Sequence, residues 1–214
     1  MIITFSGLQS FKIQFGETVL AVNPASKRSS SVPSPARFGA DLTLVSLAHP
    51  DFDGVENTQS KGKEPFVIEG PGEYEAAGVT VTGIRSPARY EGCQLNTVYT
   101  VSLEEMNLCF LGGLAEATLP SETLEQIDGV DILFVPIAGG EVLDPSEAYR
   151  LAVKLEANVV IPSHYTRTDD PVLSQFLREG GEDTVSPSDR FTAKKRDVEG
   201  RSGDIVVLTP SHSS

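Results

Sequence analysis

Residues 40–55 read ADLTLVSLAHPDFDGV, an apolar run followed by one histidine among carboxylates. The run DLTLVSL is apolar enough to predict a strand that is buried on both faces, as in a parallel sheet. The loop after it places His49 close to Asp51 and Asp53. Imidazole and carboxylate groups are common metal ligands. This stretch is therefore informative about the fold, through its strand, and about a candidate metal site, through its loop.

The length and composition predict one folded unit. The chain has 214 residues, of which 39% are hydrophobic and 22% are charged, as in ordinary globular proteins. We expect a single domain over residues 1–210 and a disordered tail over residues 211–214. Cys93 and Cys109 are too few for a disulfide scaffold and form no CxxC pair, so we expect both to be reduced.

The net charge of −13 limits the partners. It argues against nucleic acids and anionic membranes, because both would repel the protein. No apolar run approaches the roughly 18 residues that cross a bilayer, and the N-terminal residues lack the organisation of a signal peptide. We therefore expect a cytoplasmic protein. Assembly into a homo-oligomer is compatible with these properties, and no other partner is indicated.

Strands are predicted throughout the first half of the chain. SFKIQF and TVLAVN alternate apolar and polar residues around Gly16, which predicts a hairpin. Further short strands are separated by turn residues: PFVIEG, GVTVTGI, NTVYTVSL and NLCFLGG. Residues 27–37 are rich in Ser and Pro and predict an exposed loop.

Helices alternate with strands in the second half. Residues 144–157 form the clearest helix, with Asp144 as N-cap, Pro145 at the first position and Glu147 completing a capping box. Residues 170–181 repeat the Asp-Pro start. Three strands rich in β-branched residues lie around these helices: VDILFVP, NVVIP and GDIVVLTP. The order predicts an α/β sandwich with sheets inside and helices outside.

Five landmarks follow one another over about residues 3–165. They are ITFSGLQSFKIQFGETVLAVNP, ADLTLVSLAHPDFDGV, EGPGEYEAAGVTVTGI, CFLGGLAE and VVIPSHY. In number, order and spacing they resemble the metallo-β-lactamase fold, a four-layer αββα sandwich. The GPGEYE stretch is very similar to one in the small bacterial lactonase-like branch, which includes proteins similar to ascorbate-6-phosphate lactonase.

This resemblance implies two metal ions that activate a water molecule, held by histidines and aspartates. The chain departs from that pattern at the ligand positions. Leu47 and Phe52 stand where the first and last histidines of the loop are expected, and Gly113 stands where an aspartate bridges the ions. Near the N-terminus, Leu8 and Asn23 stand where His and Asp are common.

Four groups of the implied pocket remain: His49, Asp51, Asp53 and His164. The chain has three histidines in total, too few for a two-ion centre, so we expect no dinuclear site and no metal cofactor. The alternative is one zinc or manganese ion held by these four groups. The simpler interpretation is that Asp51 and Asp53 cap the following turn and that His164 hydrogen-bonds its neighbours.

Other candidate sites carry weaker signals. Ser46 and Ser163 adjoin or lie near histidines in sequence, which does not establish the geometry of a nucleophile and its base. Glu73 and Glu75 share one face of a strand if that segment is extended, and two solvated carboxylates are the commoner outcome. The glycines of FLGGLAE favour a tight turn over a phosphate-binding loop. The basic stretch KRSSS, residues 27–31, is expected to be solvated.

Two functions are compatible with this sequence. The first is a metallo-β-lactamase-like protein that has lost its dinuclear site and hydrolase activity and is retained to bind a ligand or a protein, or to assemble with itself. The second is a metal-dependent hydrolase of low or altered activity with one ion, acting on a lactone, an ester or a phosphorylated sugar. The missing ligands favour the first, and the fold alone does not decide whether the protein is an enzyme.

Overall fold

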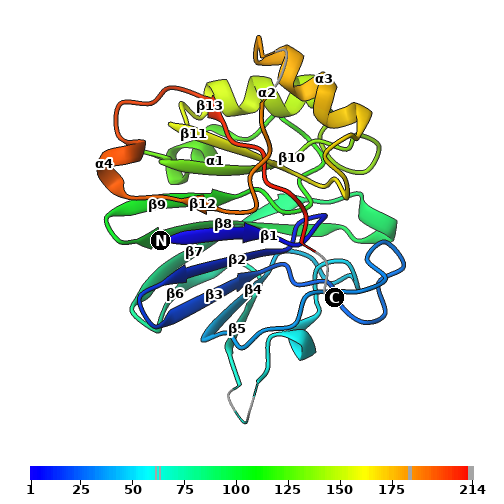
Figure 1. Ribbon diagram of the computed structural model, residues 1–214, viewed down its shortest axis with the longest axis vertical. Helices are drawn as coiled ribbons and strands as arrows, with labels where there is room; N and C mark the ends of the chain where they lie inside the picture. Colours follow the sequence, from blue (N-terminus) through cyan, green and yellow to red (C-terminus); the bar gives the residue numbers. More distant parts are fainter. Residues whose placement is uncertain (61, 63, 183–184, 212–214) are drawn as a thin grey trace.

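Two β-sheets face each other in the protein, and the α-helices lie with the second sheet (Figure 1). The computed structural model describes residues 1–60, 62, 64–182 and 185–211. The predicted α/β sandwich, with the sheets inside, is confirmed.

The first sheet has the strand order β12-β1-β2-β3-β4-β5. Its strands are β1 (Ile2–Phe5), β2 (Phe11–Phe15), β3 (Thr18–Val22), β4 (Leu42–Val45), β5 (Phe66–Glu69) and β12 (Phe191–Thr192). The pairs from β12 to β3 are antiparallel, whereas β3, β4 and β5 are parallel. The predicted hairpin is the β2–β3 pair, and its turn uses Gly16 at a φ of +54°. All four residues of β4 are buried, as predicted for a strand inside a parallel sheet.

The second sheet has the strand order β13-β11-β10-β9-β8-β7-β6. Its strands are β6 (Gly72–Ala76), β7 (Val79–Pro87), β8 (Leu95–Leu103), β9 (Met106–Phe110), β10 (Ile132–Pro136), β11 (Val159–Ser163) and β13 (Asp204–Ile205). The pairs from β6 to β9 are antiparallel, and those from β9 to β13 are parallel. The strand predicted over residues 203–210 is shorter than expected, because only two of its residues form β13.

The described chain contains the α-helices α1 (Ser121–Gln126), α2 (Pro145–Lys154), α3 (Pro171–Glu179) and α4 (Lys195–Val198), with short 3-10 turns η1 (Val55–Asn57) and η2 (Tyr90–Gly92). The two predicted helices, α2 and α3, begin directly after Asp144 and Asp170 as expected, whereas α1 and α4 were not predicted. At α2, the Asp144 carboxylate accepts the Glu147 N–H at 2.8 Å, and the Glu147 carboxylate accepts the Asp144 N–H at 3.2 Å. The predicted capping box is therefore confirmed.

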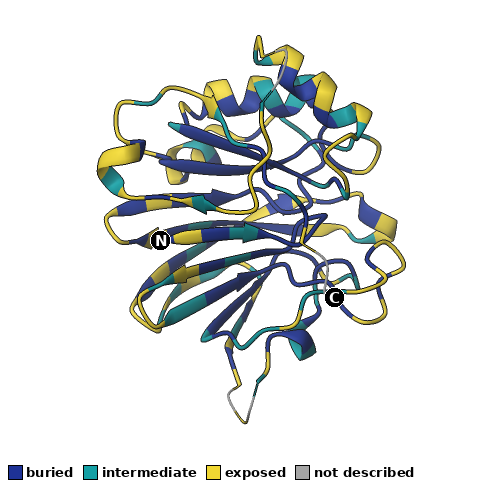
Figure 2. Cartoon of the chain, in the orientation of Figure 1, coloured by how far each residue is buried: buried dark blue, intermediate teal, exposed yellow. Residues whose placement is uncertain are grey.

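Apolar side chains fill the space between the sheets, and the strands that border this space are largely coloured as buried in Figure 2. Phe11 of the first sheet contacts Phe134 of the second with ring centroids 4.8 Å apart, and Phe134 stacks on Phe110 at 4.2 Å. These rings are at most 1% exposed. Burial of such large aromatic surfaces is the main contribution that holds the two sheets together.

The outer face of the first sheet has a thin covering. Ala40 donates its N–H to the Thr58 carbonyl at 2.9 Å, and the Thr58 hydroxyl bonds the hydroxyl of Thr43 on β4 at 3.0 Å. A loop and η1 thus form this layer, and among the described residues no α-helix lies there (Figure 1). The fourth layer expected from an αββα sandwich is therefore reduced in this chain.

The two ends of the described chain are tied to the first sheet. The Met1 ammonium donates to the Ala193 carbonyl at 2.8 Å, and the Ser211 N–H donates to the Phe5 carbonyl at 2.8 Å. Ser211 belongs to the segment 211–214 predicted as a disordered tail, and the rest of that segment lies outside the described residues. In the part of the chain that is described, every helix is too short or too polar to traverse a bilayer.

Candidate functional site

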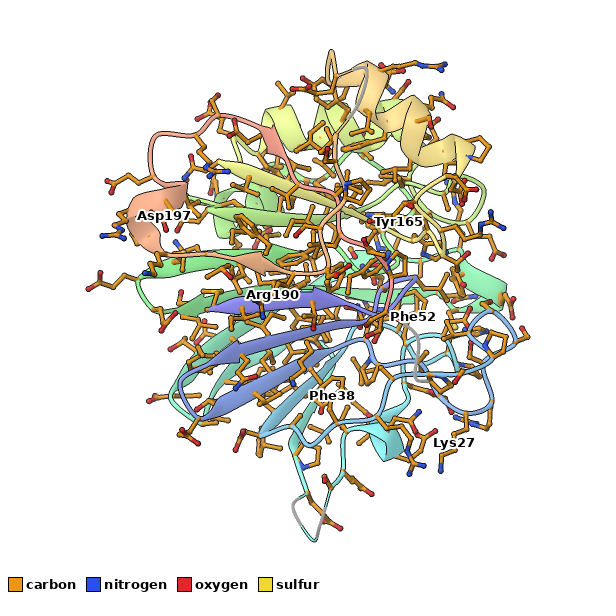
Figure 3. The ribbon with its side chains drawn as sticks, viewed as in Figure 1. Lys27, Phe38, Phe52, Tyr165, Arg190 and Asp197 are labelled. Carbon is orange, nitrogen blue, oxygen red and sulfur yellow. The ribbon has the colours of Figure 1, made fainter. Side chains whose placement is uncertain are left out.

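The predicted site residues lie at one end of the sandwich, in the loops that follow β4 and β11. His49, Asp51 and Asp53 come after β4, and His164 is the first residue after β11. Each strand pairs in parallel with a neighbour, and ligands commonly bind at the carboxyl ends of parallel strands. Figure 3 labels Phe52, which lies between Asp51 and Asp53 in the sequence, among these loops.

Asp51 is a buried carboxylate surrounded by hydroxyl donors. Ser29 donates to its Oδ1 at 2.5 Å, while Ser31 and Tyr90 donate to its Oδ2 at 2.8 and 2.7 Å. The residue is only 1% exposed. Burial alone would raise the pKa of Asp51, but the three hydrogen bonds lower it below the ordinary value. The carboxylate is therefore ionised at neutral pH and stabilised by hydroxyl groups.

Tyr90 provides one of these donors and stays neutral. Burial, followed by the hydrogen bond to Asp51, raises the pKa of its hydroxyl. A hydroxyl with a raised pKa keeps its proton, so Tyr90 can donate to the carboxylate over the whole physiological range.

Both ring nitrogens of His49 have protein partners. Nε2 lies 2.8 Å from Glu91 Oε2, and Nδ1 accepts the Asp51 N–H at 3.2 Å. The distance from Nδ1 to Asp51 Oδ2 is 3.9 Å, so His49 and Asp51 are neighbours in space as well as in sequence. The ring packs edge-on against Tyr90, with centroids 4.9 Å apart.

His164 also packs against Tyr90, with ring centroids 5.5 Å apart. Its Nδ1 is 3.3 Å from Nε2 of Gln9, which confirms the expectation that His164 hydrogen-bonds its neighbours. Burial lowers the pKa of His164 to about 4, although the Asp51 carboxylate opposes this shift. The imidazole is therefore neutral at neutral pH. The backbone of His164 has a φ of +67°, and its N–H donates to the Leu8 carbonyl.

A small cluster of buried side chains fills the space between these groups. We call it the apolar plug, and its residues are Leu47, Phe52, Ala88, Tyr90 and Val142. Leu47 is 2% exposed and Phe52 is completely buried. The Phe52 ring lies 5.1 Å from the Tyr90 ring and 6.4 Å from the His164 ring, measured between centroids. Leu47 and Phe52 stand where the resemblance implies histidines, and both side chains pack in the apolar plug.

Gly113 lies against the apolar plug. A Cβ atom at this position would stand 2.9 Å from Cδ1 of Leu47 and 3.6 Å from Cζ of Phe52. Carbon atoms in contact are normally about 3.5–4.0 Å apart, so any larger residue here, aspartate included, requires Leu47 to move. The three positions at which the resemblance implies metal ligands are thus packed against one another.

The donor set does not fit a two-ion centre. Both oxygens of Asp51 accept hydroxyl hydrogen bonds, and His49 Nε2 is engaged with Glu91. Asp53 forms an ion pair with Arg28 at 3.3 Å. Within the described ranges, no three His, Cys, Asp or Glu side chains are grouped as they would be to hold a metal ion. His49, Asp51 and His164 all contact Tyr90, whereas Asp53 pairs with Arg28, so these four side chains do not form a ligand set.

The two positions near the N-terminus have structural roles. Leu8 and Asn23 have φ values of +49° and +46°. The Asn23 side chain accepts the Ser46 N–H at 2.8 Å and so fixes the end of β4. Leu8 packs with Ala25 and Val32 under the Ser/Pro-rich loop.

Some of the remaining expectations need correction. The 3-10 turn η1 has Gly54 at its N-cap and no side-chain cap, so the prediction that Asp51 and Asp53 cap this turn is wrong. In the basic stretch 27–31, both basic residues, Lys27 and Arg28, are exposed as expected, whereas Ser29 is buried.

The other candidate pairs show no catalytic arrangement. Ser163 donates to Gln9 Oε1 at 3.0 Å, and the Ser46 hydroxyl has no hydrogen-bond partner within the described part of the chain. Neither serine is hydrogen-bonded to a histidine among the described residues. Glu73 and Glu75 are exposed on β6, as expected for two solvated carboxylates.

Four residues of this site were not predicted to belong to it: Ser29, Ser31, Tyr90 and Asn96. Asn96 accepts the Gly113 N–H at 2.8 Å and donates to the Leu111 carbonyl at 2.9 Å, which shapes the turn behind the plug. The run of three serines at 29–31 was the one available signal. Hydroxyl groups in a loop are compatible with so many roles that the run could not be assigned to Asp51.

Comparisons with known proteins agree with this architecture. A family model described as "Beta-lactamase superfamily domain" matches residues 2–164. A search of curated proteins returned no match.

Solved structures from several organisms have the same architecture. A crystal structure from Thermotoga maritima, of a candidate Zn-dependent hydrolase of the metallo-β-lactamase superfamily, has a TM-score of 0.75 and 24% sequence identity, covering 97% of this chain and 98% of that chain. Igni18, a metallo hydrolase from Ignicoccus hospitalis KIN4/I, has a TM-score of 0.63 and 15% identity, covering 100% of this chain and 97% of that chain. Likeness at these identities shows the fold, and the predicted metallo-β-lactamase fold is confirmed.

Proposed function

The chain belongs to the β-lactamase superfamily domain family, and from this premise we propose that it is a non-catalytic member with degenerate metal motifs, retained for binding. Within the family we assign it to the small lactonase-like branch, on the GPGEYE stretch at residues 70–75. In place of a dinuclear centre, the protein has the apolar plug and a carboxylate held by hydroxyl groups.

The observation that carries this proposal is the environment of Asp51. A buried carboxylate needs compensation by a cation or by several hydrogen bonds. Here three hydroxyl groups supply it. A metal ion at Asp51 would have to displace these donors and also enter space that Leu47 and Phe52 fill. The apolar residues at the implied ligand positions are therefore consistent with the hydroxyl donors around Asp51.

The second candidate is a hydrolase with one ion at His49, Asp51, Asp53 and His164. It is favoured only by the nearness of His49 to Asp51, 3.9 Å between Nδ1 and Oδ2. It would require Asp53 to leave Arg28 and Asp51 to give up hydroxyl donors. We therefore retain binding as the proposed role.

Metal analysis tests the proposal. Protein purified without chelator is analysed for its metal content, and its melting temperature is then followed during titration with zinc and with manganese. We expect far less than one equivalent of metal and no metal-dependent rise in melting temperature, because binding to the folded state alone would stabilise it. Two tightly held equivalents, or metal-dependent hydrolysis of a lactone, an ester or a sugar phosphate, would contradict the proposal.

Two variants identify any residual metal binding. His49→Ala removes the imidazole next to Asp51, and His212→Ala removes the histidine of the C-terminal segment. Weak binding that disappears only in His212→Ala does not depend on His49 and leaves the proposal standing. Binding that disappears in His49→Ala and persists in His212→Ala supports the one-ion hydrolase instead.

A further inference from the structure

The loop that joins β7 to β8, residues 88–94, reaches the buried carboxylate of the site. We call it the cover loop. At its base, Pro87 of β7 pairs with Leu95 of β8. Beyond this base the loop places Tyr90, which is 7% exposed, against Asp51, with 2.7 Å between the tyrosine hydroxyl and Oδ2. One inward side chain thus anchors the cover loop to the site.

The other fastenings of the cover loop are polar contacts at the surface. His49 Nε2 lies 2.8 Å from Glu91 Oε2, and the Glu91 N–H donates to Glu141 Oε1 at 3.1 Å. The Arg89 guanidinium pairs with Glu116. The side chains of Glu91 and Arg89 are 60% and 62% exposed. Each of these contacts contributes little to stability, because water competes for exposed polar groups.

The backbone of the cover loop makes its hydrogen bonds within the loop. The Ala88 N–H donates to the Gln94 carbonyl at 3.2 Å, and the Cys93 N–H donates to the Tyr90 carbonyl at 2.8 Å. Among the described residues, no backbone–backbone hydrogen bond joins this loop to a segment outside the β7–β8 hairpin. The loop can therefore leave the site without breaking the pairing of any strand or helix, as segments of low local stability do.

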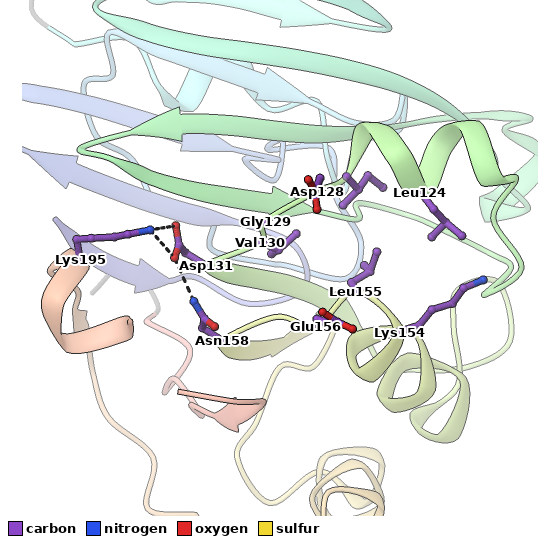
Figure 4. A pocket seen from close by; sticks show the side chains of 11 residues that line it. Leu124, Asp128, Gly129, Val130, Asp131, Lys154, Leu155, Glu156, Asn158 and Lys195 are labelled. Carbon is purple, nitrogen blue, oxygen red and sulfur yellow. Dashed lines mark hydrogen bonds and ion pairs between the residues drawn. The ribbon is translucent and has the colours of Figure 1, made fainter. Parts of the chain in front are cut away.

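A second buried carboxylate, Asp131, is held in a different way. It is 3% exposed and lines a hollow of about 410 Å³ between the ends of α1 and α2. Its oxygens accept Lys195 Nζ at 2.9 Å and Asn158 Nδ2 at 3.1 Å (Figure 4), and also the Asn107 N–H at 2.9 Å. These donors lie on α4, on β9 and directly before β11. Asp131 is thus neutralised by a cation and held by regular elements, whereas Asp51 depends on hydroxyl groups from loops.

We propose that the cover loop is a lid that opens and closes over Asp51 and His164 while the rest of the protein stays folded. In the closed state the Tyr90 ring packs against both histidines, 4.9 Å from the His49 ring and 5.5 Å from the His164 ring between centroids. Tyr90 is therefore an internal occupant of the site, and a ligand reaches the site only after this side chain withdraws. This inference rests on the proposed function, because it gives the route by which a retained binding site is reached.

Opening of the lid leaves the Asp51 carboxylate compensated. Ser29 and Ser31 belong to another loop and keep their hydrogen bonds to Asp51, at 2.5 and 2.8 Å. Water replaces the Tyr90 hydroxyl, because a carboxylate that becomes exposed is readily hydrated. The Tyr90 and Phe52 rings, which pack 5.1 Å apart, lose apolar contact when the lid opens. The closed state therefore predominates, and the open state is a minor population.

Native-state hydrogen exchange of the full chain tests this proposal, followed by NMR at urea concentrations below the unfolding transition. The informative amides are those of Phe52 and Asp53, which donate to the His49 carbonyl at 2.8 and 3.0 Å. We expect both amides to exchange faster than those of β8 and with little dependence on urea, because opening a loop exposes less surface than global unfolding.

The variant Glu141→Ala loosens the cover loop from outside the site. It removes the acceptor of the Glu91 N–H, and in the described chain Glu141 has no hydrogen bond to residues 46–54. We expect the same two amides to exchange about threefold faster, as for the loss of one exposed hydrogen bond. Glu75→Ala is the matched control, since it removes an exposed carboxylate of β6 and should leave these rates unchanged.

Two results would overturn the proposal. The first is exchange of the Phe52 and Asp53 amides with the rate and urea dependence of β8, which would mean that only global unfolding uncovers the site. The second is equal exchange rates in Glu141→Ala and Glu75→Ala. Failure of the proposed function is a separate outcome. Metal uptake at His49 contradicts the non-catalytic role whatever the exchange rates are, whereas a metal-free protein without local opening loses only the lid.

Discussion

At the residue scale, Asp51 determines the character of the site. An ionised carboxylate that is 1% exposed is stable only if its oxygens are fully hydrogen-bonded. Ser29, Ser31 and Tyr90 meet that requirement from two separate loops. The hydroxyl of a tyrosine thus lies against a carboxylate that the resemblance implies as a metal ligand.

The variant Tyr90→Phe measures how much the hydrogen bond from Tyr90 to Asp51 contributes to stability. It removes the hydroxyl and keeps the ring of the apolar plug, so we expect the free energy of unfolding to fall by about 1–3 kcal/mol. Chemical denaturation at pH 7 measures the change. Tyr149→Phe is the matched control, because the Tyr149 hydroxyl makes no hydrogen bond among the described residues and its removal should change stability little. Equal effects of the two variants would show that the bond to Asp51 contributes nothing.

His164 makes stability depend on pH. Its pKa is about 4 in the folded protein and about 6.5 when unfolded. Between these values the unfolded chain binds the extra proton and the folded chain does not, so stability is full above about pH 6.5 and falls as the pH is lowered towards 4.

We expect this effect to cost the wild type about 1–3 kcal/mol between pH 7 and pH 4.5. His164→Asn, which tolerates the left-handed backbone at this position, should show a correspondingly smaller loss over the same range. Urea denaturation of both proteins at several pH values gives the comparison. Parallel pH profiles would mean that His164 is not buried in its neutral form.

At the scale of single elements, the residues around the start of a helix are enough to define where it begins. The N-terminus of α2 is defined by Asp144, Pro145 and Glu147, all within one turn. The loop 27–31 does not follow its local sequence in this way. All five of its residues are polar, and yet Ser29 is buried.

Asp144→Ala should lower the free energy of unfolding by about 1 kcal/mol, since it leaves the first turn of α2 without its cap. Asp144→Asn is the matched control, because asparagine caps helices about as well as aspartate. Thermal unfolding of the wild type, Asp144→Ala and Asp144→Asn measures these differences. A loss of the same size in both variants would assign the effect to the charge and not to the cap.

At the scale of the whole molecule, stability comes from contact between the two sheets. Phe134 touches Phe11 across the interface and Phe110 within its own sheet. No local signal marks Phe134 as the residue that joins them, because the three phenylalanines are far apart in the chain.

Phe134→Ala should cost about 3–5 kcal/mol, because it removes a buried ring and leaves a cavity between the sheets. Val153→Ala is the control for loss of apolar surface alone, since Val153 is 59% exposed on α2. Equilibrium denaturation of both variants measures the difference. A loss below about 1 kcal/mol for Phe134→Ala would mean that the sheets do not depend on this contact.

Residue types and short patterns were enough to predict the sandwich, the buried strand β4, the hairpin around Gly16, the cap of α2 and the shortage of histidines. These features depend on residues that are a few positions apart in the chain. Three contacts are visible only in the folded molecule: Ser29, Ser31 and Tyr90 meet at Asp51, Leu47 packs on Gly113, and Asp53 and Glu69 line the same pocket. Those contacts join loops up to 66 positions apart along the chain (47 to 113). Their geometry is set by how the two sheets pack, a property that belongs to no single segment.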